Sequence, residues 1–187
     1  YYFSKGWFDR TVKYKVDTLK NRHATLEFQI FTGEPNKIGA VSAEIRTPIL
    51  DSIYNQSKDN SWLKNGAQFD FSNFDKERSR VSNNFRNSGV YYFSQDYIRF
   101  ENDTIGKDKQ VDVKMTVANR IIRIGDSLSQ RAFKVYKIKD VNVFTDASFE
   151  NRSQLSPKKT ATFNGFNFYN FKKLKYKPKS IANVIQI

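Results

Sequence analysis

"NNFRNSGVYYFSQDYIRFENDT", residues 83–104, joins the end of a helical pattern to a run of aromatic residues. Gly89 stands where the two patterns meet, and glycine there favours the left-handed backbone that ends a helix. The apolar residues that follow it are Val90, Tyr91, Tyr92, Phe93, Tyr97, Ile98 and Phe100. Because aromatic and β-branched residues favour strands, we expect residues 90–100 to form one strand. Tyr92, Ile98 and Phe100 are expected to contact a core.

The segment before Gly89, "SNFDKERSRVSNNFRNSG" at residues 72–89, has the pattern of an amphipathic helix. Ser72 with Asp75 three residues later resembles a capping box, which marks a helix start. Three apolar residues share one helical face: Phe74, Val81 and Phe85. We therefore predict a helix of about four turns that ends at Gly89 and buries Phe85 against a sheet.

Two segments of the chain repeat one hairpin pattern, at residues 5–30 and 88–117. In both, a glycine (Gly6 or Gly89) precedes an aromatic strand, an Asp-Thr pair, a polar turn and an alternating strand. The alternating apolar positions are Ala24, Leu26, Phe28 and Ile30 in the first segment, and Val111, Val113, Met115 and Val117 in the second. Alternation with a period of two is typical of a half-buried strand. The sequence thus predicts two hairpins, each with one buried face.

A second repeat joins residues 36–45 to residues 136–145, and both segments carry a Lys-Ile-x-x-Val motif typical of a strand. A proline-led run follows each, from Thr47 and from Lys177, and proline suits the first turn of a helix. In the later copy, residues 146–176 are expected to form a long loop with short added strands. These patterns predict an α+β unit of strand, helix, helix, strand, strand over residues 33–119. Residues 1–32 are expected to end a preceding unit, and residues 120–187 to form a linker and begin another.

The order of these elements, with "SKGWFDRTVKYKVD", the block at residues 63–104 and the restart "VYKIKDVNV", resembles POTRA domains. These repeats occur in outer-membrane assembly factors of the BamA and TamA superfamily, and the block "ERSRVSNNFRNSGVYYFSQDYIRFENDT" is most similar to TamA-like lipoproteins of Bacteroidota. The resemblance implies tandem units of two helices on a three-stranded mixed sheet, with the outer units incomplete. It leaves open whether the machine is BAM-like or TAM-like.

The resemblance also implies a function at the periplasmic face of the outer membrane. POTRA repeats handle nascent outer-membrane proteins, and an edge strand accepts an extended peptide by β-augmentation. The implied partners are those client proteins and accessory subunits, either lipoproteins or a TamB-like protein, and the full-length protein is expected to continue into an outer-membrane β-barrel. The residues expected at the client-binding edge are Tyr91, Tyr92, Phe93, Gln95, Tyr97 and Arg99. Gln95 is expected to direct its backbone outward from the sheet, while Gly6, Phe85 and Gly89 are expected to be structural.

Catalytic chemistry is not expected from this sequence. The chain has no cysteine, which excludes disulfides and thiolate zinc sites, and its single histidine, His23, stands in a polar turn. The pairs Asp75/Glu77 and Glu101/Asp103 fall at a helix start and a strand end, where capping and solvation account for them. No glycine-rich phosphate loop is present. We therefore expect no enzyme activity, no cofactor and no metal.

The charge balance suggests a second class of function. The chain carries 32 Lys and Arg against 19 Asp and Glu, for a formal net charge of +13. This excess would attract anions, and aromatic residues on a strand are able to stack bases. The alternative is therefore an anion- or nucleic-acid-binding protein with a basic, aromatic sheet face. It predicts a β-α-β-β-α-β order, which the repeats do not have, so no specific nucleic acid is expected.

Overall fold

The computed structural model describes residues 1–19, 23–150 and 156–185. Its contacts divide the chain into two compact units, Tyr1–Tyr136 and Lys137–Ile187, which are described separately. The finer division expected from the sequence, at residues 32 and 119, stays a prediction. Within the described ranges, no helix is both long enough and apolar enough to cross a membrane.

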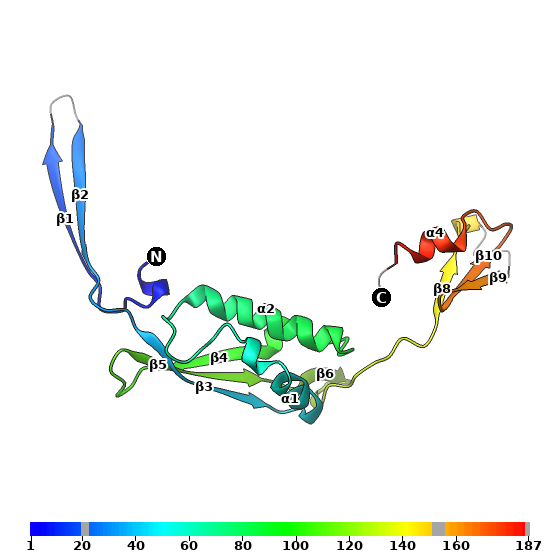
Figure 1. Ribbon diagram of the computed structural model, residues 1–187, viewed down its shortest axis with the longest axis horizontal. Helices are drawn as coiled ribbons and strands as arrows, with labels where there is room; N and C mark the ends of the chain where they lie inside the picture. Colours follow the sequence, from blue (N-terminus) through cyan, green and yellow to red (C-terminus); the bar gives the residue numbers. More distant parts are fainter. Residues whose placement is uncertain (20–22, 151–155, 186–187) are drawn as a thin grey trace. The chain divides into compact units, whose positions relative to one another are not determined.

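The centre of the first unit is a three-stranded mixed sheet on which two helices pack (Figure 1). Its strands are β3 (Lys37–Ile45), β4 (Ile98–Asp103) and β5 (Gln110–Val117), and its helices are α1 (Pro48–Asn55) and α2 (Phe71–Asn87). The sheet order is β3-β5-β4, with β3 parallel and β4 antiparallel to β5. This confirms the predicted α+β class and the order strand, helix, helix, strand, strand.

Helix α2 forms because its apolar residues recur on one face. Phe74, Val81 and Phe85 are all buried, and Phe85 is fully so. The helix ends before Gly89, whose φ of 88° lies in the left-handed region, as the sequence predicts. Its start differs from the prediction, because Asp70 is the N-cap and its side chain accepts a hydrogen bond from the Ser72 N–H. Ser72 already lies in the first turn, so it does not cap the helix.

The helices and the sheet enclose a core of two adjoining clusters. The larger cluster contains Leu50, Tyr54, Val81, Phe85, Val90, Phe93, Ile98, Met115, Val117 and Phe133, and the smaller contains Ile38, Leu63, Phe69, Phe74, Val111 and Val113. All four alternating residues predicted on β5 lie in these clusters. The period-two pattern thus correctly identified the face of β5 that packs beneath α2.

The expected strand over residues 90–100 was wrong for its first eight residues. Val90 to Ser94 form a turn, Gln95–Tyr97 is a short 3-10 helix, and only from Ile98 does the chain pair as a strand. The Val90 N–H donates to the Phe85 carbonyl and the Phe93 N–H to the Val90 carbonyl. This turn places Val90 and Phe93 in the core, and their burial outweighs the strand preference of the aromatic residues.

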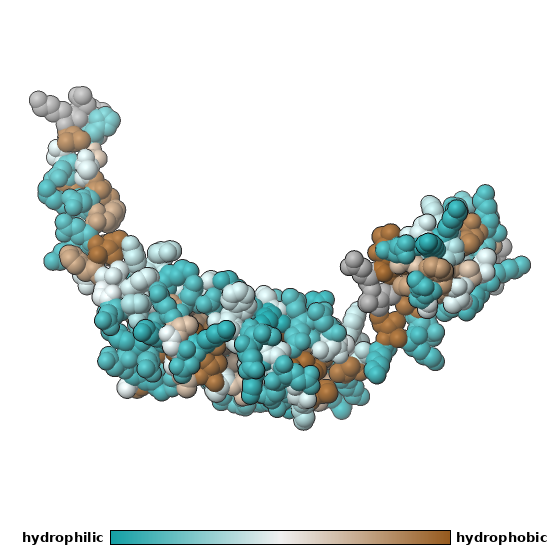
Figure 2. Space-filling model, in the orientation of Figure 1, coloured by the Kyte–Doolittle hydropathy of each residue, from teal (hydrophilic) through white to brown (hydrophobic). Residues whose placement is uncertain are grey.

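The first unit also contains two hairpins, β1 (Thr11–Thr18) with β2 (Ala24–Phe31), and β6 (Arg120–Ile124) with β7 (Ser127–Arg131). The expectation that the first would have a buried face was wrong, because every residue of β1 and β2 is exposed. No element among the described residues covers its apolar side, which Figure 2 shows as brown surface along the hairpin. Residues 120–131 were expected to be part of a linker, but they pair as a hairpin.

The second unit has a smaller sheet with the same strand order and directions as the first. Its strands are β8 (Val141–Phe144), β9 (Lys158–Phe163) and β10 (Phe166–Asn170), in the order β8-β10-β9, followed by the short helix α4 (Pro178–Ala182). Residues 146–176 were expected to be a long loop with added strands, and the strands are present. One of them, β10, is the central strand of the sheet, and its Phe168 is fully buried.

Candidate strand-binding edge

The free side of β4 is the candidate functional site. In the order β3-β5-β4, one side of β4 pairs with β5, and no strand in the described ranges pairs with its other side. Unpaired N–H and C=O groups along an edge form a template for another strand. The expectation that this strand lies at a sheet edge is therefore correct.

The hydrogen-bond register shows which residues of β4 face outward. The Ala118 N–H donates to the Tyr97 carbonyl at 3.0 Å, so Tyr97 and Ala118 are a hydrogen-bonded pair. Bonded and non-bonded pairs alternate along an antiparallel ladder. Arg99, Glu101 and Asp103 therefore direct their backbone groups toward β5, and Ile98, Phe100 and Asn102 direct theirs toward the free side.

Helix α2 covers the start of this edge through Arg78. The Arg78 Nε donates to the outward carbonyl of Ile98 at 3.4 Å, and its guanidinium carbon lies 5.2 Å from the centroid of the Phe100 ring. The same side chain forms an ion pair with Asp75. The open part of the edge is therefore the later half of β4, around Phe100 and Asn102.

An apolar cavity of about 590 Å³ lies beside this open half. Its lining includes Phe3, Phe8, Phe69, Phe71, Asn102 and Val111. Phe3 and Phe71 are each 55% exposed at its wall, while Phe69 is buried in the core. A strand that paired with β4 would thus pass an aromatic recess able to accept a large apolar side chain.

Gly6 holds the segment that forms one wall of this cavity. Its φ is 94°, and its carbonyl accepts hydrogen bonds from both the backbone N–H and the side-chain amide of Asn36, at 2.8 and 2.9 Å. A Cβ on Gly6 would lie 2.9 Å from the Asn36 carbonyl oxygen and 3.0 Å from that of Phe69. No side chain fits there, so glycine allows the turn carrying Phe3 to pack against the unit.

An ion pair reinforces the same contact. The Lys5 ammonium lies 2.6 Å from the Asp70 carboxylate, and Lys5 also accepts a hydrogen bond at its carbonyl from the Gln68 side chain. The hydrogen bond from Lys5, opposed by partial burial and aided by bonds from Ser72, lowers the pKa of Asp70 to about 2. Asp70 therefore caps α2 and ties the cavity wall to the start of that helix.

Replacing Asp70 by Asn should lower the stability at neutral pH by roughly 1 kcal/mol, because the pair is partly exposed. The pKa of Asp70 is depressed on folding, so its contribution is present above its unfolded value near 3.8 and is lost as the pH falls toward about 2. Urea unfolding of the parent and of Asp70→Asn should show a difference at pH 7 that disappears between about pH 4 and pH 2. Asp59→Asn, at an exposed position, is the control. If the stability difference between parent and Asp70→Asn did not change with pH, the Lys5–Asp70 ion pair would not be its cause.

The structure separates the residues that the sequence placed together at the binding edge. Tyr91 and Tyr92 are exposed on the turn after α2, and Phe93 is buried. Gln95 lies in the 3-10 helix and donates to the Ser79 hydroxyl, so it has no outward position on a strand, contrary to expectation.

Of the same set, Tyr97 precedes the strand and packs against Phe93 and Phe133. Arg99 alone lies on β4, with its backbone toward β5. Their client-binding role stays a prediction. Because Phe93 is buried and the tyrosines leave the strand, the aromatic sheet face required by the nucleic-acid alternative is not formed by these residues.

Sequence reasoning missed Glu77, which it treated as solvated. Glu77 is 1% exposed, and its carboxylate accepts hydrogen bonds from the Trp62 N–H at 3.0 Å and from Arg80 at 2.6 and 2.9 Å. Arg80 also donates to the Ser57 carbonyl, and its hydrogen bond with Glu77 raises its pKa. This network joins α2 to the segment after α1. Arg80, which follows Glu77 by three positions on the same helix, was the sequence signal that could have predicted this ion pair.

Comparison with known proteins returns structural likenesses only. No protein-family profile and no curated protein matches the chain. BamA from Haemophilus ducreyi lacking POTRA domains 1–3 is similar over 64% of this chain and 21% of its own, with 16% identity and a TM-score of 0.39. BamA POTRA3-5 from Haemophilus influenzae is similar over 92% of this chain and 76% of its own, with 9% identity and a TM-score of 0.42.

This chain therefore spans about a fifth of the first of these structures. Both TM-scores lie below 0.5, so the fold assignment rests on the chain's own order and pairing of strands. That assignment is an α+β unit in which two helices pack on a mixed sheet of order β3-β5-β4.

Proposed function

We propose that this chain is a POTRA-like segment that binds extended segments of nascent outer-membrane proteins and passes them on. Its place would be the periplasmic face of the outer membrane. The observation that carries the proposal is the open half of β4, where the backbone of Phe100 and Asn102 faces outward beside the aromatic cavity. An incoming strand would extend the sheet by one strand, as in β-augmentation.

Such binding would be weak at a single edge. Each backbone hydrogen bond contributes about 0.5–1.5 kcal/mol net, and the open half of β4 offers few of them. Several units in tandem would raise the effective concentration of binding sites and hold a client longer. Weak, repeated contacts suit transfer of a client better than its storage. Because the backbone makes most of the contacts, specificity would come from the alternation of client side chains and from the aromatic cavity.

Two further parts of the proposal concern the assembly around this chain. Accessory subunits, either lipoproteins or a TamB-like protein, would dock on the units, and the full-length protein would continue into an outer-membrane β-barrel. The order of elements in the first unit, which matches the arrangement implied for POTRA domains, supports this setting. Copurification of the full-length protein from membranes, with and without this segment, tests whether the segment recruits such subunits.

Asn102→Pro tests the strand-binding edge. Proline removes the outward N–H of Asn102 and places a ring where the incoming strand would pair. We expect an extended peptide of alternating apolar and polar residues, about ten residues long, to bind roughly two- to tenfold more weakly to this variant, from the loss of one hydrogen bond. The affinity is measured by fluorescence anisotropy of a labelled peptide, at concentrations that reach saturation.

Asn102→Ala is the matched control, because it removes the same side chain and keeps the N–H. It should bind the peptide like the parent, and both variants should retain the parent's near-ultraviolet circular dichroism. Equal binding by the proline variant and the parent would show that peptides do not pair with this edge. Equal weakening by proline and alanine would assign the effect to the side chain instead.

A further inference from the structure

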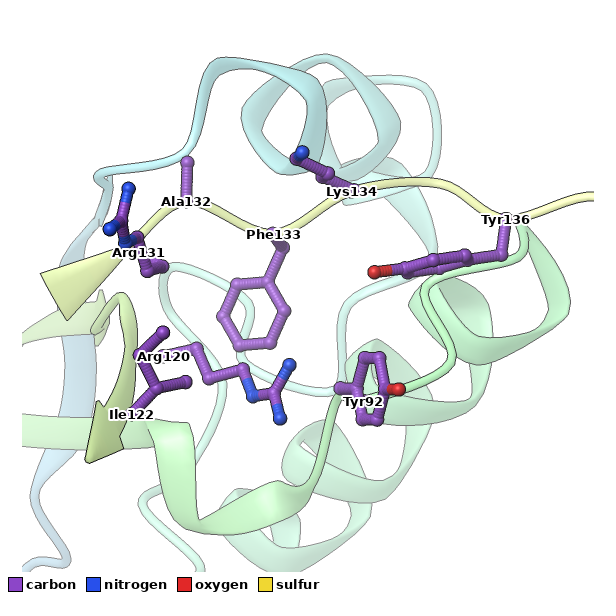
Figure 3. Close-up of a pocket in the computed structure, with 8 residues that line it drawn as sticks. All are labelled: Tyr92, Arg120, Ile122, Arg131, Ala132, Phe133, Lys134 and Tyr136. Carbon is purple, nitrogen blue, oxygen red and sulfur yellow. The ribbon is translucent and has the colours of Figure 1, made fainter. Parts of the chain in front are cut away.

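A second cavity, of about 460 Å³, lies in the first unit away from the β4 edge. It is formed by the hairpin of β6 and β7, the turn after α2 and the segment that follows β7 (Figure 3). The residues that line it include Tyr92, Arg120, Ile122, Arg131, Phe133 and Tyr136. Phe133 is buried and reaches the main core, so the floor of the cavity is apolar.

Two arginines occupy directly opposed positions on the two strands of this hairpin. Arg120 and Arg131 are direct cross-strand partners in the β6–β7 register, so their side chains leave the same face. Like charges directly opposite each other destabilise an antiparallel pair. Among the described residues, neither arginine has an acidic partner in an ion pair, and Lys134 at the same cavity has none either. No Asp or Glu lines the cavity.

Aromatic contacts position one of these arginines. The guanidinium carbon of Arg120 lies 3.9 Å from the centroid of the Tyr92 ring, and Tyr136 meets the same ring edge-on, with centroids 5.6 Å apart. Figure 3 shows the Arg120 guanidinium against Tyr92. Stacking occupies a face of the guanidinium and leaves its N–H edges available to donate.

Hydrogen bonds hold the segment that follows β7 and carries Tyr136. The Tyr136 N–H donates to the Gly89 carbonyl at 2.8 Å, and a Cβ on Gly89 would lie 2.5 Å from the Tyr136 carbonyl oxygen. The Phe133 N–H donates to the Thr47 hydroxyl, which donates to the Asn119 side chain. The cavity is therefore built from segments that hydrogen bonds hold in place.

We propose that this cavity binds the phosphate group of an organic phosphate monoester, with Arg120 and Arg131 as its ligands. The Arg120 guanidinium, stacked on Tyr92, would donate to a phosphate dianion in parallel hydrogen bonds. Arg131, whose side chain leaves the same face of the hairpin, would turn its guanidinium toward the same phosphate on binding. A volume of about 460 Å³ is in the range of small-molecule sites and leaves room for the organic part against Phe133 and Tyr92. This site is independent of the β4 edge.

The test uses the whole chain and two probes that carry the same phosphate chemistry. Glycerol 3-phosphate represents a soluble ester, and vesicles containing phosphatidic acid represent a lipid headgroup, with phosphatidylserine vesicles as the comparison for negative charge alone. Binding of the soluble probe is followed by amide chemical shifts, and binding to vesicles by sedimentation. We expect saturable binding of at least one probe, and Arg120→Gln or Arg131→Gln should weaken it about tenfold.

Lys64→Gln is the control, since it removes one exposed positive charge outside the cavity and should change affinity less than twofold. Binding only to phosphatidic acid vesicles, lost in Arg120→Gln, would identify the source as a lipid. Saturable, Arg120-dependent binding of glycerol 3-phosphate would identify it as a soluble ester. Absence of saturable binding with both probes, or equal weakening by Lys64→Gln and Arg120→Gln, would overturn the proposal.

Melting temperature gives a second readout. Arg131→Gln should raise the melting temperature of the free chain, because it removes the repulsion of Arg120. If the ligand is a soluble ester, glycerol 3-phosphate should raise the melting temperature of the parent more than that of the variant, because it binds preferentially to the folded state and more tightly to the parent. A parent that melts at the same temperature with and without either probe would overturn the site.

Discussion

Phe85→Ala should lower the free energy of unfolding by about 3–5 kcal/mol, the range for removing a buried phenylalanine side chain. Phe85 is fully buried at the centre of the larger cluster, and its ring meets that of Phe93 edge-on, with centroids 4.8 Å apart. The loss combines the transfer free energy of the ring with the cavity left among α1, α2 and the sheet. Because domains of this size are stable by only about 5–15 kcal/mol, this loss would remove a large fraction of the unit's stability.

Urea unfolding followed by circular dichroism at 222 nm measures this loss as a shift in midpoint. Phe71→Ala is the control on the same helix, because Phe71 is 55% exposed and its truncation should cost well under half as much. If the two variants had the same midpoint, α2 would not pack through the face that contains Phe85.

Glu77→Ala should also cost about 3–5 kcal/mol, for an electrostatic reason. The substitution leaves the Arg80 guanidinium, which is only 16% exposed, without its carboxylate, and it leaves the Trp62 N–H without an acceptor. A charge that remains desolvated and unpaired destabilises the fold more than the pair stabilises it. Removing both residues should therefore cost less than the sum of the two single changes.

A double-mutant cycle measures this coupling. Glu77→Ala, Arg80→Ala and the double variant should give a coupling of roughly 0.5–3 kcal/mol. The pair Asp75–Arg78 is the matched control, since it lies on the same helix at the same spacing, but the Asp75 side chain is 71% exposed. Its coupling should fall within about 0–1 kcal/mol. Equal coupling for the two pairs would mean that Glu77 and Arg80 are solvated in the folded protein.

The sequence by itself determined the parts of this fold that depend on neighbouring residues. The period of three to four residues in Phe74, Val81 and Phe85 defined α2, the period of two in β5 identified its buried face, and Gly89 marked the helix end. Each of these signals is local, because the hydrogen bonds of a helix or the two faces of a strand involve residues close in sequence. The repeated order of such signals was enough to predict the β-α-α-β-β unit.

Only the tertiary structure decided which residues form the sites. Val90 and Phe93 turn into the core instead of extending β4. They do so because Phe85 on α2 and Phe133, which follows β7 and is distant in sequence, offer a buried surface. Glu77 is buried because Arg80 and the segment after α1 meet its carboxylate. The edge residues Phe100 and Asn102 and their aromatic cavity likewise depend on pairing between distant segments. The position of Arg120 over Tyr92 depends on the contact between β6 and the turn after α2. A sequence pattern records which side chains prefer burial, whereas the register of distant strands sets which backbone groups and charges remain unpaired.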